Sequence, residues 1–367
     1  MGAGRTKYTA HSVMSRFTVG EVTREGQRLV ELRDTATGAW AHVWPDVGSN
    51  CVAARVPAPD RPSELVDLLL DPPALEDVRR EPSHYGIPLL WPFPSNMPRG
   101  EYSFDGRAGK FARQSHGFVL ERAWTVGETA ADETGGEMTG VFDSREHPET
   151  LEWFPYPYRV ESTYRLDAKG LSLRFTVVNS GDGRLPFGYG AHPYFKLPLG
   201  PRGSRGECLL HVPAARRWNG PALRAVSDGV VAPPEDLLPP IAPELDLRRP
   251  TKLVERMYDG VWTDLTLVDG LVECAALDPV NGRKAVMRAT PNHANVTVFT
   301  PAWAPGVCFE PWTCPPNAFN LAARGVPGNG LTVLAPGERW EGTTWLSIEP
   351  LQPGEATGSP GRAGSTG

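Results

Sequence analysis

LSLRFTVVN, residues 171–179, alternates apolar and polar side chains along most of its length. Leu171, Leu173, Phe175 and Val177 fall on one face of an extended chain, and the polar residues between them fall on the other. A period of two is typical of a strand that buries one of its faces. The segment therefore predicts a half-buried strand.

The segment before it, RVESTYRL (159–166), alternates in the same way, and DAKG between the two predicts a hairpin turn. Further short β-rich runs occur at residues 28–33, 262–268, 295–300, 306–310 and 343–348. Only residues 63–69 and 74–80 offer helical patterns, and both segments are short. With 39 glycines and 38 prolines spread through the 367 residues, the pattern indicates an all-β sandwich or barrel and disfavours alternating βαβ units.

The organisation expected from these patterns is a single domain over residues 1–350. Within it, residues 213–250 are rich in Pro, Arg and Asp and weak in periodicity, which predicts a long excursion over the surface. Residues 351–367 have few large apolar side chains, so a disordered tail is expected there.

The charge balance limits the classes of partner. The chain has 37 Lys and Arg against 43 Asp and Glu, a net charge of -6, which offers no broad basic surface for a nucleic acid. A small or uncharged ligand fits better. Five scattered cysteines, an odd number, indicate reduced thiols, and the absence of a signal-peptide core or membrane-spanning run leads us to expect a cytoplasmic protein with no membrane partner.

A histidine in GYGAHPYFKLP (188–198) is the first candidate for chemistry. His192 lies among glycines, aromatic residues and prolines directly after a strand-like segment, where small neighbours let a ligand approach closely. His192 is therefore the best acid or base candidate. From local sequence alone, a buried histidine bonded to a backbone carbonyl fits equally well.

A glutamate in CFEPWTCPPNAFN (308–320) is the second candidate. Glu310 lies between Phe309 and Trp312, and desolvation there is expected to raise its pKa and make it a stronger base near neutral pH. Trp312 offers an aromatic ring that can stack on a ligand. The commoner fate of such a glutamate is an ion pair with a surface arginine.

Two turn-like segments add candidates. His116 lies in QSHGFVLERAW (114–124), beside Gly117, where a strand is expected to begin; a turn histidine without function fits as well. Asp259 lies in YDGVWTDL (258–265), and turns commonly use Asp-Gly without any function.

No motif requires a cofactor or a metal. GYGAHP lacks the third glycine of a dinucleotide fingerprint, and no helical pattern follows it. Cys308 and Cys314 are not spaced as a zinc pair, so neither is expected to be a ligand.

Taken together, GYGAHPYFKLP, CFEPWTCPPNAFN, SHGFVLERAW and GEYSFDGR (100–107) resemble the aldose 1-epimerase (galactose mutarotase) family, over roughly residues 15–350. The resemblance implies a large antiparallel β-sandwich of the galactose mutarotase-like supersandwich type, with few short helices and a sugar cleft on its concave face. It also implies a cofactor-independent isomerase that interconverts the α and β anomers of an aldose by opening and reclosing the sugar ring.

The resemblance assigns roles to the four candidates. Glu310 matches the carboxylate that removes the proton of the anomeric hydroxyl, and His192 matches the histidine that protonates the ring oxygen. His116 matches a second histidine that contacts the sugar near the ring oxygen, and Asp259 matches an aspartate that orients hydroxyl groups. Both proton transfers reverse on ring closure, so the chemistry needs no metal or nucleotide.

One substrate-binding position departs from the family pattern. An arginine usually precedes the glycine-containing segment that GEYSFDGR matches, but here Asn96 stands at that position and Arg99 lies three residues further on. Either Arg99 reaches the substrate from a shifted loop, or the site lacks this guanidinium.

Three other functions stay open. A hexose-6-phosphate 1-epimerase needs cations for the phosphate, and the candidates nearby in sequence are Arg99, Lys110, Arg113 and Arg122. A non-catalytic carbohydrate-binding protein on the same fold is consistent with the missing arginine. A glycoside hydrolase that pairs Glu310 with Asp259 is disfavoured, because a histidine acid is superfluous in that chemistry.

Overall fold

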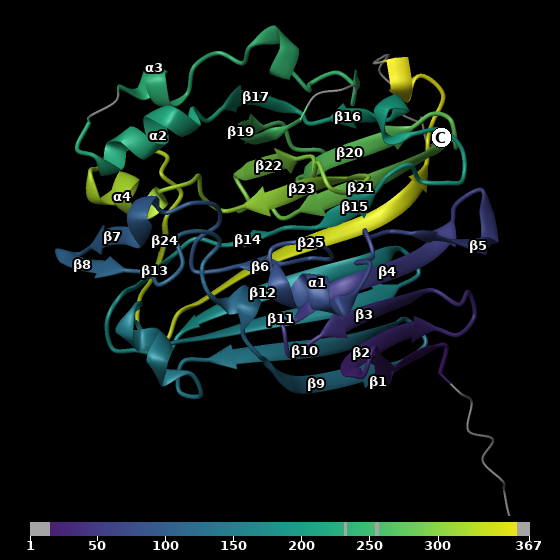
Figure 1. The fold of residues 1–367 in the computed structure, drawn as a ribbon, viewed down its shortest axis with the longest axis horizontal. Coiled ribbons are helices and arrows are strands. Elements are labelled where there is room, and N and C mark those ends of the chain that lie inside the picture. Colours follow the sequence, from purple (N-terminus) through teal and green to yellow (C-terminus); the bar gives the residue numbers. More distant parts are fainter. Residues whose placement is uncertain (1–14, 231–232, 254–256, 358–367) are drawn as a thin grey trace, which may run out of the picture.

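The computed structural model describes residues 15–230, 233–253 and 257–357. These residues form antiparallel sheets that pack as two layers (Figure 1). The first layer is a nine-stranded sheet. In spatial order its strands are β18 (Thr251–Lys252), β16 (Leu209–His211), β20 (Val272–Asp278), β21 (Arg283–Ala289), β25 (Arg339–Pro350), β12 (Gly170–Asn179), β11 (Tyr158–Asp167), β10 (Gly135–Asp143) and β9 (Thr125–Ala131).

The second layer contains two further sheets. The five-stranded sheet has the order β1 (Phe17–Arg24), β2 (Gln27–Asp34), β3 (Trp40–Trp44), β4 (Asn50–Ala58) and β5 (Arg61–Asp67). The seven-stranded sheet has the order β17 (Ala214–Arg217), β19 (Asp259–Leu265), β22 (Asn295–Phe299), β23 (Gly306–Trp312), β14 (Gly190–Ala191) and β6 (Leu89–Leu90), with β15 (Tyr194–Lys196) also paired to β23. Two short pairs complete the strands: β7 (Glu101–Phe104) with β8 (Arg107–Lys110), and β13 (Leu185–Phe187) with β24 (Thr332–Leu334).

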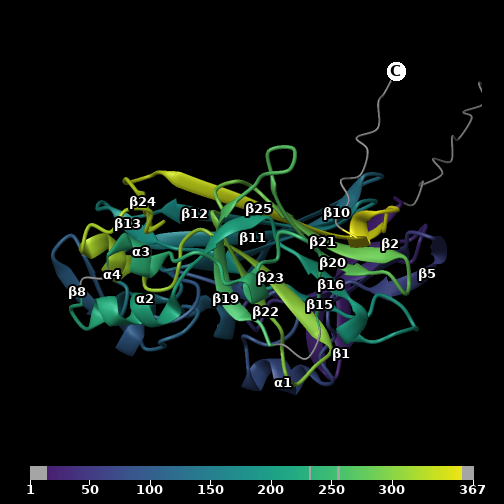
Figure 2. The same cartoon turned by 90° about the horizontal axis from the view of Figure 1, so that it is seen from above.

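The alternation of residues 171–179 produces the expected strand. β12 pairs with β11 through a hairpin in which Leu166 faces Leu171, and β25 pairs with its other edge. The four apolar residues of β12 are buried, whereas Arg174 between them is exposed. Figure 2 shows β12 and β25 in one layer and β19, β22 and β23 in the other.

One continuous core joins the layers. It includes apolar side chains from β11, β12 and β25 on one side and from β4, β22 and β23 on the other. Phe175 of β12 stacks on Tyr189 just before β14, with ring centroids 4.0 Å apart and planes 10° apart. The fold is thus the all-β sandwich that the sequence predicts.

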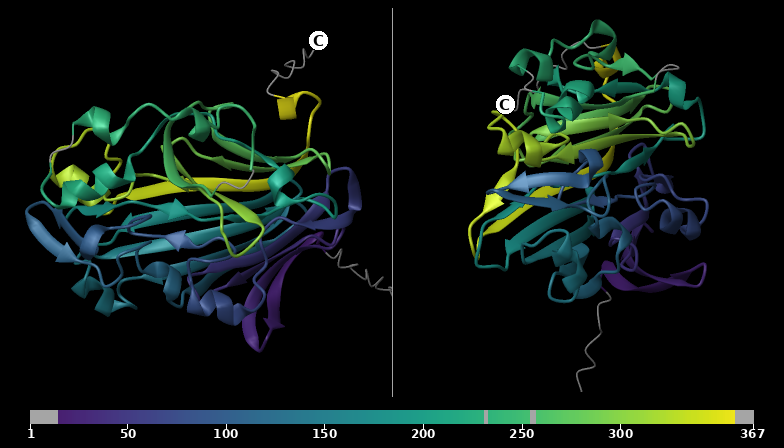
Figure 3. Two further views of the ribbon diagram at one scale, coloured as in Figure 1. Left: turned by 45° about the horizontal axis from the view of Figure 1, so that its top comes forward. Right: turned by 60° about the vertical axis from the view of Figure 1, so that its left-hand side comes forward.

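The described helices are short and lie outside the sheets. They are α1 (Leu75–Arg80), α2 (Gly220–Ser227), α3 (Pro234–Leu237) and α4 (Ala318–Ala323). In Figure 3 the long strands of the nine-stranded sheet cross most of the molecule, and α2, α3 and α4 gather at one end. The expected excursion over 213–250 contains β17, α2 and α3, and it packs on the end of the seven-stranded sheet.

Two local predictions are wrong. Residues 63–69 form most of β5 and no helix, because β4 offers its edge and pairs Val56 with Val66, whereas an isolated helix of two turns is marginal. Residues 114–124 form no strand, because His116 and Gly117 both have positive φ, 64° and 68°, which interrupts an extended chain. A 3-10 turn, Val119–Glu121, follows instead.

Ordered structure continues beyond residue 350. Residues Glu355–Thr357 form a 3-10 turn, and Lys284 donates a hydrogen bond to Glu355 at 2.6 Å. The rest of the expected disordered tail, residues 358–367, lies outside the described residues, and the domain limits stay a prediction. Over the described ranges, no helix is both long and apolar enough to cross a membrane.

Candidate active site

Strand register brings the two main candidates together. Gly190 pairs with Trp312, and Tyr194 pairs with Cys308. These pairs bracket His192 and Glu310, which therefore lie opposite each other on neighbouring segments of the seven-stranded sheet. Because alternate residues of a strand share a face, Cys308, Glu310 and Trp312 all point to the side of the sheet away from the core between the layers.

His192 and Glu310 contact each other directly. The Nε2 atom of His192 lies 3.3 Å from Oε1 of Glu310, and the two residues are only 5% and 1% exposed. The ring of Tyr194 stacks on the imidazole at a centroid distance of 4.5 Å and an interplanar angle of 3°. Its hydroxyl donates to the backbone oxygen of Ser83 at 2.9 Å and lies 3.4 Å from Nε2 of His192, so the imidazole plane is held.

Burial controls the protonation of this pair. Loss of solvent raises the pKa of Glu310 well above its ordinary value, and the negative charge of Asp259 raises it further. The indole N–H of Trp312 opposes this shift without reaching hydrogen-bond geometry. Burial, followed by the influence of His116, lowers the pKa of His192 well below its ordinary value. Both directions favour a neutral pair that holds one proton in total.

Four buried polar atoms around the pair lack a partner among the described residues. They are Nδ1 of His192, Oε2 of Glu310, Oγ1 of Thr297 and Nε1 of Trp312. Thr297 belongs to this group because it pairs with Glu310 across β22 and β23. Each such atom costs about 1–3 kcal/mol when buried without a bond. A ligand with several hydroxyl groups would supply both donors and acceptors to them.

His116 joins the site from another segment. Its ring lies 5.8 Å from that of His192, edge to face. Its Nδ1 atom accepts a hydrogen bond from the backbone N–H of Ser95 at 3.1 Å. Burial and the nearby Arg113 lower the pKa of His116 to about 3, so the ring is neutral and carries its proton on Nε2.

Asp259 lies at the start of β19, opposite Phe299 of β22, and is exposed. Phe299 in turn pairs with Cys308, so Asp259 lies on the same face of the sheet as Glu310, two strands away, and its charge contributes to the raised pKa of Glu310. The structure thus gathers His192, Glu310, His116 and Asp259 from four separate segments.

The remaining candidates do not have the placement that their expected roles require. Trp312 is 2% exposed and packs among apolar residues that include Trp218 and Leu223, so its indole N–H borders the pair but its ring is too buried to stack on a ligand. Arg99 is bound on the surface by Asp228 at 2.7 Å and Glu101 at 3.0 Å, and Asn96 is exposed. Of the two explanations for the missing arginine, the structure favours a site without it.

Two residues next to the pair, Tyr194 and Thr297, are not among the site residues predicted from the sequence. Tyr194 lies two residues after His192, and a period of two was the signal that places both on one face. Thr297 carries no local signal, because only the pairing of β22 with β23 brings it next to Glu310.

One group of side chains has the composition of a metal site. Potential ligand atoms of His192, Cys308 and Glu310 all lie within 4.8 Å of one another. Burial raises the pKa of the Cys308 thiol, and a protonated thiol is a poor ligand. The thiol would have to lose its proton for these three residues to hold a metal.

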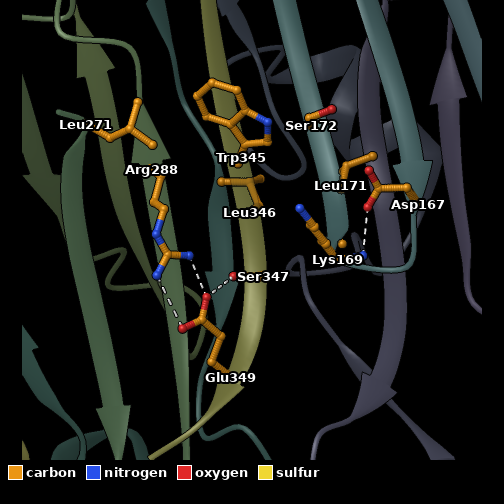
Figure 4. Close-up of a pocket in the computed structure, with 11 residues that line it drawn as sticks. Asp167, Lys169, Leu171, Ser172, Leu271, Arg288, Trp345, Leu346, Ser347 and Glu349 are labelled. Atoms are coloured by element: carbon orange, nitrogen blue, oxygen red, sulfur yellow. Dashed lines mark hydrogen bonds and ion pairs between the residues drawn. The ribbon is translucent and has the colours of Figure 1, made fainter. Parts of the chain in front are cut away.

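A separate hollow of about 450 Å³ lies on the outer face of the nine-stranded sheet (Figure 4). Trp345 and Ser172 line it, and Arg288 at its edge donates to Glu349 at 2.5 Å. Its lining includes none of the candidate residues. The candidate residues lie in the other layer of the sandwich.

Comparison of the whole fold defines its class. A galactose mutarotase-like protein from Clostridium acetobutylicum superimposes with a TM-score of 0.75, at 21% identity, over 92% of this chain and 99% of that one. The GalM/aldose epimerase homologue from C. elegans gives 0.66 at 13% identity, over 92% and 100%. The fold is that of the galactose mutarotase-like proteins.

The sequence defines the family. The model of the aldose 1-epimerase family matches residues 43–347, and the chain belongs to that family. Uncharacterized protein YphB of Escherichia coli is 26% identical over 201 residues, 53% of this chain and 61% of YphB, so the match spans less than two thirds of that relative. Uncharacterized protein YihR of the same organism is 25% identical over 248 residues, 65% of this chain and 72% of YihR.

Proposed function

We propose that the protein is an aldose 1-epimerase in which Glu310 acts as the base and His192 as the acid. The observation that supports this most strongly is the buried contact between Nε2 of His192 and Oε1 of Glu310 at 3.3 Å. One proton shared by two groups is what anomer interconversion needs, since one site must accept a proton while another donates one.

The proposed reaction uses this single proton and returns it at the end of each cycle. The pKa directions favour Glu310 as the holder of the shared proton in the resting pair, and the active form is the tautomer in which that proton has moved to His192, so that Glu310 is ionised. Glu310 takes the proton of the hydroxyl on C1, a C1=O double bond forms, the bond between C1 and the ring oxygen breaks, and His192 gives its proton to that oxygen. After rotation about the C1–C2 bond, the steps run backwards and restore both groups.

His116 and Asp259 have positioning roles in this proposal. The Nε2–H of neutral His116 is a donor for the ring oxygen or its neighbouring hydroxyl. Asp259 is an acceptor for hydroxyl groups at the open edge of β19. The unpaired polar atoms of Thr297 and Trp312 would bond further hydroxyls of the same sugar.

The alternative substrates have less support. Three of the four arginine and lysine candidates for a phosphate site are occupied by carboxylates: Arg99 by Asp228, Arg113 by Glu121 at 3.0 Å and Arg122 by Glu149 at 2.6 Å. A non-catalytic sugar-binding protein does not require a buried carboxyl group with a raised pKa in contact with a histidine, so these two features favour the enzyme.

The test is polarimetry of freshly dissolved α-glucose and α-galactose with the wild type and Glu310→Gln. We expect the substitution to lower kcat by about 10²- to 10⁴-fold, the usual contribution of a general base. Glu128→Gln, an exposed glutamate on β9, is the matched control and should keep the wild-type rate. Equal rates for Glu310→Gln and wild type would refute the assignment. Wild-type protein that binds a sugar but accelerates no anomerisation would support the binding-protein alternative.

A further inference from the structure

Four aromatic side chains line one flank of His192. We call them the aromatic wall: His84, Tyr194, Phe299 and Trp303. The indole of Trp303 stacks on His84 with centroids 4.0 Å apart and planes 21° apart. Phe299 lies 5.7 Å from Trp303 and 5.9 Å from His192, centroid to centroid. The wall therefore runs from the catalytic imidazole outward.

Trp303 is the exposed end of this wall. Its side chain is 43% exposed, whereas Tyr194 is 1% exposed. Trp303 lies in the loop between β22 and β23, and His84 lies in the loop after α1; Figure 2 shows these elements at the same edge of the molecule. An exposed indole joined to a buried catalytic residue by a row of rings is suited to contact a ligand at the mouth of the site.

The loop that carries Trp303 is held in place. One guanidinium nitrogen of Arg205, Nη1, donates to the backbone oxygens of Pro301 at 2.7 Å and Ala304 at 3.0 Å. These two bonds bracket Trp303 in the sequence. Fixing the loop in advance lowers the ordering cost of binding a ligand against the indole.

The charges around the wall are unfavourable for an anion. Burial lowers the pKa of His84, which keeps its ring neutral, and Glu81 opposes this shift only in part. Arg80 nearby is paired with Asp77 at 2.6 Å. Among these side chains the carboxylates of Asp77 and Glu81 outnumber the guanidinium of Arg80. The guanidinium of Arg205 at the Trp303 loop already bonds two backbone oxygens.

We propose that Trp303, supported by His84, is a specificity-determining residue that stacks on the C–H face of an uncharged aldose at its C5 end. This inference rests on the proposed function, because it takes the ring oxygen to lie at His192. The ring oxygen joins C1 to C5, so the C5 substituent extends along the flank of His192 that the wall occupies. Aromatic rings bind apolar C–H surfaces, and a phosphate here would lose its hydration beside a guanidinium, that of Arg205, which already bonds the loop backbone.

Binding is measured in Glu310→Gln, so that turnover does not interfere. Isothermal titration calorimetry with glucose, galactose, the 6-deoxy sugar fucose and glucose 6-phosphate compares this protein with versions that also carry Trp303→Ala or Trp303→Phe. We expect Trp303→Ala to raise the Kd of the neutral sugars about tenfold and Trp303→Phe to restore most of the affinity. Glucose 6-phosphate should bind more weakly than glucose.

Trp345→Ala is the matched control. Trp345 is similarly exposed, at 38%, but it lies on the outer face of the other layer (Figure 4), so its removal should leave the Kd unchanged. Thermal unfolding of each variant checks that the fold is intact.

Three outcomes would overturn the inference: an unchanged Kd in Trp303→Ala, an equal loss in Trp345→Ala, or tighter binding of the sugar phosphate. In wild-type kinetics, a stacking role raises KM while kcat stays near its original value. Binding that depends on Trp303 in a wild-type protein without turnover would refute the proposed function alone and leave the sugar-binding role of the wall intact.

Discussion

His192 and Glu310 show how a sheet brings two common residues together as a buried pair. From local sequence alone, each residue also has an ordinary structural explanation. The contact at 3.3 Å and the burial of both side chains change their chemistry, because each group now determines whether the other is charged. The relevant unit is the pair and its single shared proton.

This pairing predicts the pH dependence of kcat/KM. At low pH the pair gains a second proton, and the lowered pKa of His192 puts that limb below the ordinary histidine value of 6.5. At high pH the pair loses its last proton, and the raised pKa of Glu310 puts that limb well above 4.5. We expect a plateau across neutral pH, measured by polarimetry with a stable sugar in several buffers. An acid limb at or above 6.5 would contradict the neutral pair.

The sequence identified most residues of the candidate site one by one, but it did not show which of them contact one another. His192, Glu310, His116 and Asp259 stand out by their local sequence, and the structure brings all four together. The position of Arg99 was undecidable from sequence, because its partner Asp228 lies far along the chain at the end of α2. Trp312 looked available for stacking, since nothing local shows that Trp218 and Leu223 cover it.

At the scale of elements, the turn at His116 and Gly117 matters most for the site. Gly117 has φ of +68°, and a Cβ there would lie 1.9 Å from the backbone oxygen of Trp91. Only a residue without a side chain fits, and this fixes the backbone that presents His116.

Gly117→Ala should therefore lower kcat/KM at least about tenfold and reduce Tm, because the clash displaces the turn; positive φ alone costs on the order of 1–3 kcal/mol. Gly106→Ala separates the two effects. Gly106 has a similar φ of +74° but open space around it, so this variant carries the backbone strain without the clash and should keep its activity. Similar losses in both variants would show that steric exclusion by Trp91 has no special role. Activity by polarimetry and Tm by circular dichroism are the measurements.

The elements themselves were predictable to different degrees. β11 and β12 follow from their own alternation and from the turn between them. The structure of β5 does not follow from its own sequence, because SELVDLL matches a helical period nearly as well as the period of a strand. Pairing with the free edge of β4 selects the strand. The secondary structure of a segment this short depends on which strand edge or helix it packs against in the folded protein.

At the scale of the whole molecule, the site depends on how the two layers pack. Phe175 of the nine-stranded sheet stacks on Tyr189, one residue before β14 and three before His192. Both rings are buried in the continuous core. The layer without the candidate residues thus supports the segment that carries His192.

Phe175→Ala should destabilise the protein by about 3–5 kcal/mol, the range for removing a buried phenyl ring. Urea unfolding followed by tryptophan fluorescence measures this loss. Val126→Ala, at a position 43% exposed on the edge strand β9, should change the free energy of unfolding by less than about 0.5 kcal/mol. A loss below 1 kcal/mol for Phe175→Ala would show that the layers do not rely on this stack.

The register that places His192 opposite Glu310 has a consequence for how this protein tolerates change in length. Side chains of a strand alternate between its two faces, so deleting or inserting one residue between Gly306 and Phe309 would rotate the carboxylate from the site into the apolar interior. A point substitution leaves each side chain of β23 on its original face, whereas the deletion of one residue moves the following side chains to the opposite face. Mutational libraries that vary length should therefore find β23 far less permissive than the loops on either side, even where the amino acids themselves are freely exchangeable.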